Sequence, residues 1–208
     1  MAEGSRGTKR GLDAGGDGED NFSIKLLIPG FLAGCVIGKG GSVITDLQAR
    51  TSTTIRMSSN RDYFPGTNDR VLMCTGVTDN VKTAITEIIS RVEENFKSKG
   101  TKDGEPSSDE FNIGVSLPSA AAGCIIGRGG EVMKAIQASS GCKVRLASKD
   151  ELTYPSERPA TITGDAVGIA GVVCAFMDRL LSDRGLCEYQ NPGTNYDVED
   201  DGYGRGGG

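Results

Sequence analysis

The stretch Ala33-Gly34-Cys35-Val36-Ile37-Gly38-Lys39-Gly40-Gly41 occurs a second time as Ala122-Gly123-Cys124-Ile125-Ile126-Gly127-Arg128-Gly129-Gly130. In both copies an apolar pair is followed by glycine, a basic residue and two more glycines, and then by a helical pattern. Glycine adopts backbone angles that other residues resist, and it lets another backbone approach closely. A cation between the glycines indicates that the approaching group is a phosphate. The two copies therefore predict two phosphate-binding loops in one chain.

The similarity between the two halves extends beyond the loops, as internal repeats do when a whole fold unit is duplicated. At an offset of 89 residues, the matching pairs include Pro29 and Pro118, Gln48 and Gln137, and Ala49 and Ala138. After a variable stretch the offset becomes 88, which pairs Arg70 with Arg158 and Gly76 with Gly164. One unit of roughly 70–75 residues, near the small end of the domain range, therefore occurs twice.

Each unit predicts the element order β-α-α-β-β-α. Alternating or apolar runs predict strands at 22–28, 53–58 and 70–75, and again at 111–117, 143–147 and 158–163. Helical periodicity predicts helices at 33–37, 42–50 and 79–92, and again at 121–126, 131–139 and 165–181. Three short strands need cover to be stable. The predicted fold is therefore α+β, in which three helices cover a three-stranded antiparallel sheet in each unit.

Composition divides the chain into five segments. Residues 1–21 are Gly-rich, acidic and predicted to be disordered, 22–97 form the first unit, 98–110 are a flexible linker, 111–184 form the second unit, and 185–208 are an acidic, Gly-rich, disordered tail. The net charge is −5, but residues 23–97 carry +2 and residues 111–184 carry +1. The folded units are thus mildly basic, which indicates a modest and local attraction to phosphate.

Several classes of protein are disfavoured by what the sequence lacks. No apolar run reaches the ~18 residues of a membrane helix, and the polar N-terminus does not resemble a signal peptide. The chain has no histidine, and its cysteines show no C-x-x-C spacing. The spacing around Gly34, Gly38 and Lys39 does not match a P-loop, which needs four residues between its glycines and Ser or Thr after the lysine. We therefore predict no enzyme, no cofactor and no metal site.

With the loop placed between two helices of a β-α-α-β-β-α unit, the chain resembles the type I KH domain. The first unit, with LLIPGFLAGCVIGKGGSVITDLQ at 26–48, TTIRMS at 53–58 and DYFPGTNDRV at 62–71, looks like the first KH domain of the Nova splicing regulators, and next like the poly(C)-binding proteins. In KH domains the G-x-x-G loop clamps the backbone of about four single-stranded nucleotides. The resemblance covers most of 22–97 and, more weakly, 111–184.

The resemblance implies one groove in each unit, bounded by the turn, the loop and the following helix on one side and by a strand on the other. Lys39 would meet phosphate, Ile37 and Ile44 would form an apolar floor, and Arg56 and Arg70 would donate to base edges. The implied RNA-binding residues are Gly34, Cys35, Ile37, Gly38, Lys39, Gly40, Gly41, Ile44, Arg56 and Arg70, and in the second unit Gly123, Cys124, Ile126, Gly127, Arg128, Gly129, Gly130, Met133, Arg145 and Arg158.

The expected partner is single-stranded RNA, either mRNA or pre-mRNA, bound at short C/A- and pyrimidine-containing motifs. The expected role is mRNA processing, by splicing regulation or by control of mRNA stability or translation, in the nucleus, the cytoplasm or both. Two alternatives stay open: a KH-fold scaffold for protein partners in mRNA processing, and single-stranded DNA binding in transcription. No membrane partner is expected.

Overall fold

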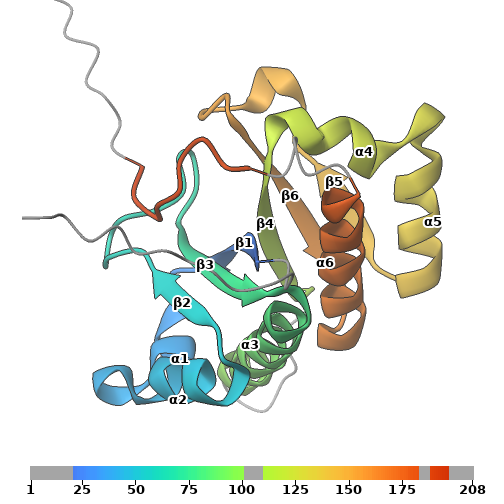
Figure 1. Cartoon of the computed structure of the whole chain (residues 1–208). Helices are drawn as coiled ribbons and strands as arrows, with labels where there is room; N and C mark the ends of the chain where they lie inside the picture. The colour runs from blue at the N-terminus through green and yellow to red at the C-terminus, as the bar shows by residue number, and fades with distance from the viewer. Residues whose placement is uncertain (1–20, 101–109, 183–187, 197–208) are drawn as a thin grey trace, which may run out of the picture.

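All six strands pair into one antiparallel sheet, in the order β2-β3-β1-β4-β6-β5 (Figure 1). The computed structural model describes residues 21–100, 110–182 and 188–196. The strands are β1 Asn21–Pro29, β2 Thr54–Met57, β3 Asp69–Val77, β4 Asn112–Pro118, β5 Lys143–Leu146 and β6 Glu157–Thr163. The first three belong to one unit and the last three to the other, so two three-stranded sheets are joined edge to edge.

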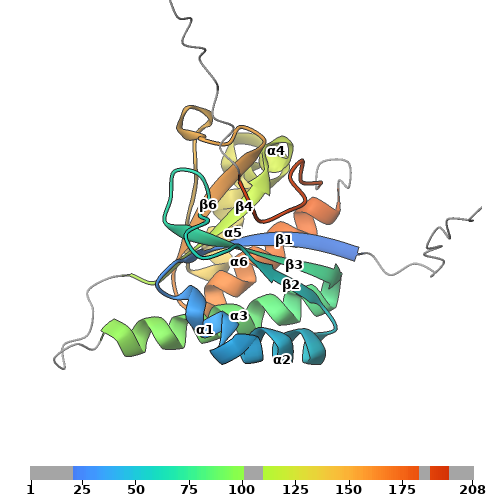
Figure 2. The same cartoon turned by 90° about the vertical axis from the view of Figure 1, so that its left-hand side faces the viewer.

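The helices of both units cover the same face of this sheet, which Figure 2 shows with α1, α2 and α3 below the strands of the first unit. The first unit contains α1 Ala33–Ile37, the 3-10 turn Lys39–Gly41, α2 Ser42–Thr51 and α3 Thr78–Gly100. The second contains α4 Ala122–Ile126, α5 Glu131–Ser140, α6 Ala166–Leu181 and 3-10 turns at Ser119–Ala121, Arg128–Gly130 and Lys149–Glu151. The predicted α+β fold and its β-α-α-β-β-α order are confirmed in both units.

Alternation along the strands divides the sheet into two unlike faces. In β1, Ile24, Leu26 and Ile28 point toward the helices and are buried in the main core. Lys25 and Leu27 point to the other, open face, where Leu27 packs in a small second cluster. The main core extends through both units without a break, so the apolar surface of each unit helps to cover the other.

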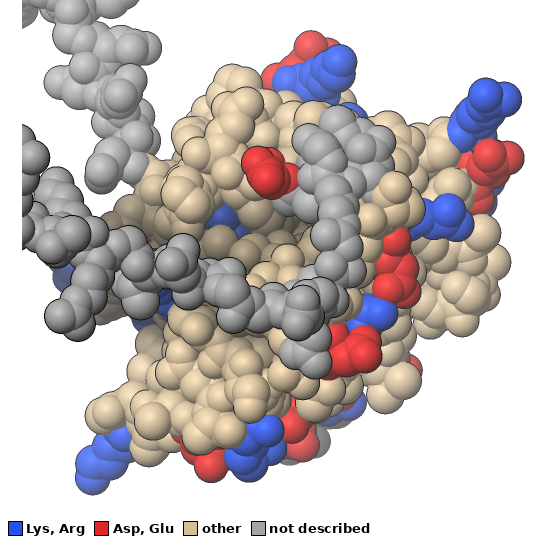
Figure 3. Space-filling view, viewed as in Figure 1, with Lys and Arg blue, Asp and Glu red and all other residues tan. Residues whose placement is uncertain are grey.

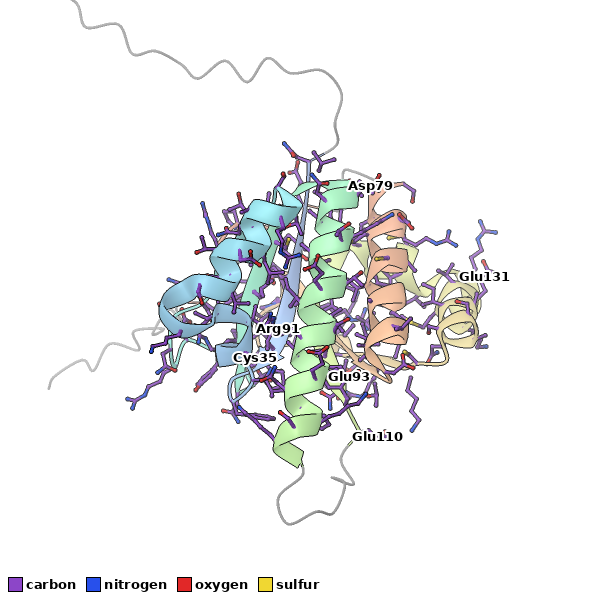
Figure 4. All side chains as sticks on the ribbon, turned by 90° about the horizontal axis from the view of Figure 1, so that it is seen from below. Cys35, Asp79, Arg91, Glu93, Glu110 and Glu131 are labelled. Carbon is purple, nitrogen blue, oxygen red and sulfur yellow. The ribbon has the colours of Figure 1, made fainter. Side chains whose placement is uncertain are left out.

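The two units meet along β1 and β4, whose register pairs Leu26 with Val115. Beneath this seam α3 lies beside α6, as Figure 4 shows from the helix side. Glu93 of α3 accepts a hydrogen bond from the backbone N–H of Ala166, at 3.0 Å, at the start of α6. Pairing of the two edge strands covers backbone groups that would otherwise be open to other chains.

This arrangement differs from the sequence-based picture of two separate units on a flexible linker. Residues 98–100 of the predicted linker are the last turn of α3, and 101–109 lie outside the described residues. Sequence patterns report which face of a strand is apolar, but they do not report which strand edge finds a partner. The seam was therefore not predictable from the repeat alone.

The tail also departs from its prediction in one part. Residues 188–196 of the predicted disordered segment 185–208 lie across the open face of the sheet, where Tyr196 is buried. Figure 2 shows this segment, in red, on the side of β1 and β4 that is opposite the helices. The rest of that segment, and residues 1–20 of the predicted disordered N-terminus, lie outside the described residues, while Asn21 begins β1.

Because the two units share one core, we expect them to unfold in a single transition. Leu26→Ala should lower the free energy of unfolding by about 2–5 kcal/mol, as for other large-to-small changes in a core, and both units should lose amide protection at the same urea concentration. Hydrogen exchange read by mass spectrometry at increasing urea measures this. Val167→Ala is the control, because Val167 is 81% exposed and its change should stay within about 0.5 kcal/mol of wild type. Protection that persists in β4–β6 after β1–β3 have lost theirs would contradict a shared core.

Candidate nucleic-acid interface

The two glycine loops have nearly the same backbone conformation. Gly38 has φ 75° and ψ 175°, and Gly127 has φ 73° and ψ 175°. Gly40 and Gly129 follow at φ 60° and 58°, both in the left-handed region. The sequence changes from lysine to arginine between these glycines, but the chain follows the same path. The two loops therefore have the same backbone structure, although the basic residue differs between them.

The glycines of the first loop serve different purposes. A Cβ atom on Gly38 would lie 2.4 Å from Cγ2 of Val43, so this glycine allows the loop to close against α2. A Cβ atom on Gly40 would meet no atom within 4 Å. The outer part of the loop is therefore open to an approaching chain, whereas its inner part is packed. The second loop repeats the same contrast, with Gly127 against Val132.

Each loop leads directly into a ten-residue helix, whose N-terminus carries a partial positive charge. In the first unit α2 has no acidic residue in its first turn, and Lys39 is exposed just before it. In the second unit Arg128 is exposed in the same place, but Glu131 begins α5. Figure 4 shows Glu131 at the outer edge of the second unit. The first loop is therefore the better site for a phosphate.

Half-buried apolar side chains lie beside each loop and form a floor. Cys35 and Ile44 in the first unit, and Cys124 and Met133 in the second, are partly buried and pack against the core. Ile37 and Ile126 are half-buried at the ends of α1 and α4. Gly34 and Gly123 are exposed, and an added Cβ would meet nothing within 4 Å. The predicted floor residues thus offer apolar surface while leaving room above it.

The thiol of Cys35 contributes to this floor as a neutral group. Its Sγ atom lies 3.9 Å from the backbone oxygen of Arg91, and Figure 4 shows both residues where α1 meets α3. Burial raises the pKa of the Cys35 thiol, while the positive charges of Arg91 and Lys99 act in the opposite direction. Cys35 therefore stays protonated at neutral pH and offers a small apolar contact.

Two floor residues were missed by the sequence-based choice of site residues. Met57 at the end of β2 and Leu146 at the end of β5 are half-buried and pack against the core beside the helices. The signal was present in the sequence, since alternation places Met57 on the same face as Ile55 and opposite Arg56. The sequence-based choice followed charge instead and selected Arg56.

The four predicted arginines divide into two pairs. Arg70 and Arg158 lie on the helix-covered face, and their guanidinium groups donate to the backbone oxygens of Ser58 and Ala147, just beyond β2 and β5. A guanidinium has five donors, so these bonds fix its position while other donors stay available to a base edge.

Arg56 and Arg145 lie on the other face of the sheet, and the structure does not bring them together with the loops. Arg56 borders a surface pocket with Ser23, Met73 and Thr75 on the open face. The guanidinium of Arg145 pairs with Glu151 and is largely exposed. The reason is strand geometry, since a residue next to a core-facing side chain must point away from the core. Their role in reading bases stays a prediction.

The two loops lie at opposite ends of the molecule, with α1 and α2 at one end and α4 and α5 at the other (Figure 1). In the space-filling view, basic side chains project at both of these corners, and acidic atoms adjoin them at the second (Figure 3). Among the described residues, no helix is long and apolar enough to cross a membrane.

Comparisons with known proteins agree with this geometry. The chain is 32% identical over 187 residues to the RNA-binding protein Nova-2 of Homo sapiens, which covers 85% of this chain and 37% of Nova-2. It is 30% identical over 176 residues to the RNA-binding protein Pasilla of Drosophila melanogaster, which covers 82% of this chain and 23% of Pasilla. This chain therefore spans less than two fifths of the length of either relative.

Among solved structures, Dim2p from Pyrococcus horikoshii OT3 aligns with 74% of this chain and 88% of its own, at 18% identity and a TM-score of 0.28, too low to carry an argument. The KH domain family matches residues 23–90 and 112–173, which is more than half of the chain and includes both glycine loops. KH domains recognise nucleic acid and are not enzymes. With two such matches and the fold described above, the chain belongs to the KH-domain family.

Proposed function

We propose that this chain is a sequence-selective protein that binds single-stranded RNA in two grooves and acts in mRNA processing. The observation that carries the proposal is the repeated loop geometry, in which an open glycine backbone and one exposed cation adjoin a half-buried apolar floor. Phosphates meet the loop N–H groups and Lys39 or Arg128, and bases lie on the floor formed by Ile44 and Met57 or by their counterparts. The RNA-binding relatives support RNA as the ligand.

The bases in each groove are read by groups on the strand side. Arg70 and Arg158, held in place by their backbone contacts, are the residues we assign to base edges. The resemblance to the Nova splicing regulators favours short C/A-containing, pyrimidine-flanked motifs, and it favours action on mRNA or pre-mRNA in the nucleus, the cytoplasm or both. Selection of bound sequences from a random RNA pool tests this, and enrichment of such a motif is expected. DNA oligonucleotides of the enriched sequence, and a search for protein partners with the loop variants, test the two alternatives.

Charge reversal in the first loop should abolish RNA binding there and leave the fold intact. Lys39→Asp with Gly40→Asp places two carboxylates against the phosphate path, at two exposed positions. We expect at least a tenfold loss of affinity for an RNA that carries one motif, and a log–log salt slope smaller by about 0.7 for each phosphate that the variant no longer neutralises. Fluorescence anisotropy at several salt concentrations measures both.

The matched control for that variant is Arg179→Asp with Gly171→Asp. Both residues are exposed on α6, and the change in net charge is the same. Unchanged binding by this control together with loss in the loop variant assigns the effect to the loop. Equal loss in both variants would show only a general attraction to phosphate, and loss of the folded circular-dichroism signal in the loop variant would mean that the loop is structural.

The shape of the loop should depend on its inner glycine more than on its outer one. Gly38→Asn should lower stability by about 1–3 kcal/mol, because φ 75° with ψ 175° is almost confined to glycine and the new Cβ would collide with Val43. Gly40→Asn should cost no more than about 1 kcal/mol, since asparagine tolerates the left-handed region. Urea unfolding of both variants measures the difference. Equal costs would refute the packing role assigned to Gly38.

A further inference from the structure

The open face of the sheet carries a polar site that the RNA-binding proposal does not use. Lys25 of β1 and Glu157 of β6 form an ion pair of 2.6 Å, and both side chains are fully buried although they come from different units. A buried ion pair is stable only when the remaining donors and acceptors of both groups are also satisfied. The groups that hydrogen-bond to Lys25 and Glu157 therefore decide whether this buried pair is stable.

Most of those partners come from residues 188–196, a segment we call the strap. The ammonium of Lys25 donates to Glu157, to the backbone oxygen of Asn191 at 2.8 Å and to the hydroxyl of Tyr196 at 2.7 Å. The strap thus supplies two of the three acceptors that a lysine needs. Glu157 in turn accepts from the Tyr196 hydroxyl at 2.7 Å and from Ser116 at 2.5 Å.

Each of the two strap tyrosines touches both units. The hydroxyl of Tyr189 donates to the backbone oxygen of Ser116 at 2.6 Å and accepts from the backbone N–H of Lys25 at 3.3 Å. These two residues are register partners where β1 meets β4. The strap therefore contacts the seam between the units directly.

The ring of Tyr196 connects the long loops of the two units. Its centroid lies 5.1 Å from that of Phe64, in the loop between β2 and β3, and 5.0 Å from that of Tyr154, in the loop between β5 and β6. Both contacts are edge-on, a favourable geometry for aromatic pairs. The ammonium of Lys25 lies 4.9 Å from the Tyr196 ring and 4.7 Å from the Tyr189 ring, within reach of a cation–π contact. Burial and the nearby Glu157 raise the pKa of the Tyr196 hydroxyl, so it stays a donor.

The site exists once, although the fold unit exists twice. At the offsets of the repeat, Gly114 stands where the first unit has Lys25, and Asp69 stands where the second has Glu157. The equivalent place therefore lacks the ammonium group, and the side chain of Leu27 lies over Gly114 instead. The strap therefore meets this ion pair at one place on the sheet, and the equivalent place in the other half of the repeat does not offer it.

We propose that the open face of the sheet is a peptide-binding site whose ligand is the chain's own strap. The docked strap reinforces the β1–β4 seam from the side opposite the helices, and so narrows the range of spacings between two RNA motifs bound at once. The strap acts as a positioning element, because it joins the strands and the long loops of the two units without touching the glycine loops. The RNA part of this inference rests on the proposed function, and the peptide-binding part does not.

The peptide-binding part is tested by cutting the folded, full-length chain. A protease recognition sequence inserted after Arg184 allows the strap to be severed from the rest after folding. We expect the severed fragment to stay with the folded units during gel filtration, and to separate from them in a variant with Tyr189→Ala and Tyr196→Ala. Glu188→Ala with Gln190→Ala is the matched control, because both residues lie on the same strap and neither is buried, and its fragment should stay bound.

Two outcomes would overturn the peptide-binding part. A wild-type fragment that separates at once would show that the strap is not held by the face. A protein that elutes as a dimer, with strap exchange between differently labelled copies, would show that the site binds the strap of a second chain and does not act within one chain.

The orientation part is tested with RNAs that carry two copies of the selected motif, separated by spacers of increasing length. Wild type should bind most tightly at one spacer length. Its affinity there should be at least tenfold higher than at the spacer length that it binds most weakly, which is a small gain compared with the ~10²–10⁴-fold that linking two sites can give. In the double tyrosine variant the affinity optimum should become lower and broader, while affinity for a single motif should not change. A profile of the same height and width in both proteins would refute the reinforcing role. If the wild type bound no RNA at all, the proposed function would fail, and the fragment test would still decide whether the strap is a bound peptide.

Discussion

The pairing of β1 with β4 is the contact on which the rest of the structure depends. It joins two small sheets into one, and it places α3 beside α6 so that their apolar faces share a core. A unit of about 70 residues buries a modest fraction of its surface and is marginal when alone. Joining two such units edge to edge adds buried area and removes two open strand edges at once. The glycine loops are thereby carried on one framework, at fixed positions at its two ends.

The loops themselves depend on a more local constraint. Gly38 and Gly127 hold a backbone conformation that side chains exclude, and this turns the chain sharply from one short helix into the next. The same turn exposes the following backbone and the cation to a ligand. Stability and binding are therefore assigned to different positions within a few residues of each other. The inner glycine keeps the shape, and the outer residues remain free to meet phosphate.

The repeat predicted the element order, the loops and the half-buried floor residues, because these follow from local periodicity and glycine chemistry. The sequence-based choice also included Arg56 and Arg145, which lie on the face away from the helices, because residue type was given more weight than the alternation that puts Met57 on the helix-covered face. Their role in reading bases stays a prediction. The repeat could not predict the seam or the strap, since both depend on contacts between distant residues. Lys25 and Glu157 are 132 residues apart, and each looks like an ordinary surface charge in the sequence. Tyr189 and Tyr196 lie in a stretch whose average composition is that of a disordered tail.

The antiparallel register at Leu26 and Val115 has a consequence for the direction of a bound strand. Equivalent strands that run in opposite directions relate the two units by an approximate half-turn, so the two grooves have opposite polarity. Under the proposed function, a continuous nucleic-acid strand that enters one groove from its 5′ side would have to reverse its course before it could enter the other groove in the same sense. The intervening nucleotides would then form a hairpin-like bend. A duplicated fold unit joined in this way would therefore double the binding surface and also fold its ligand back on itself.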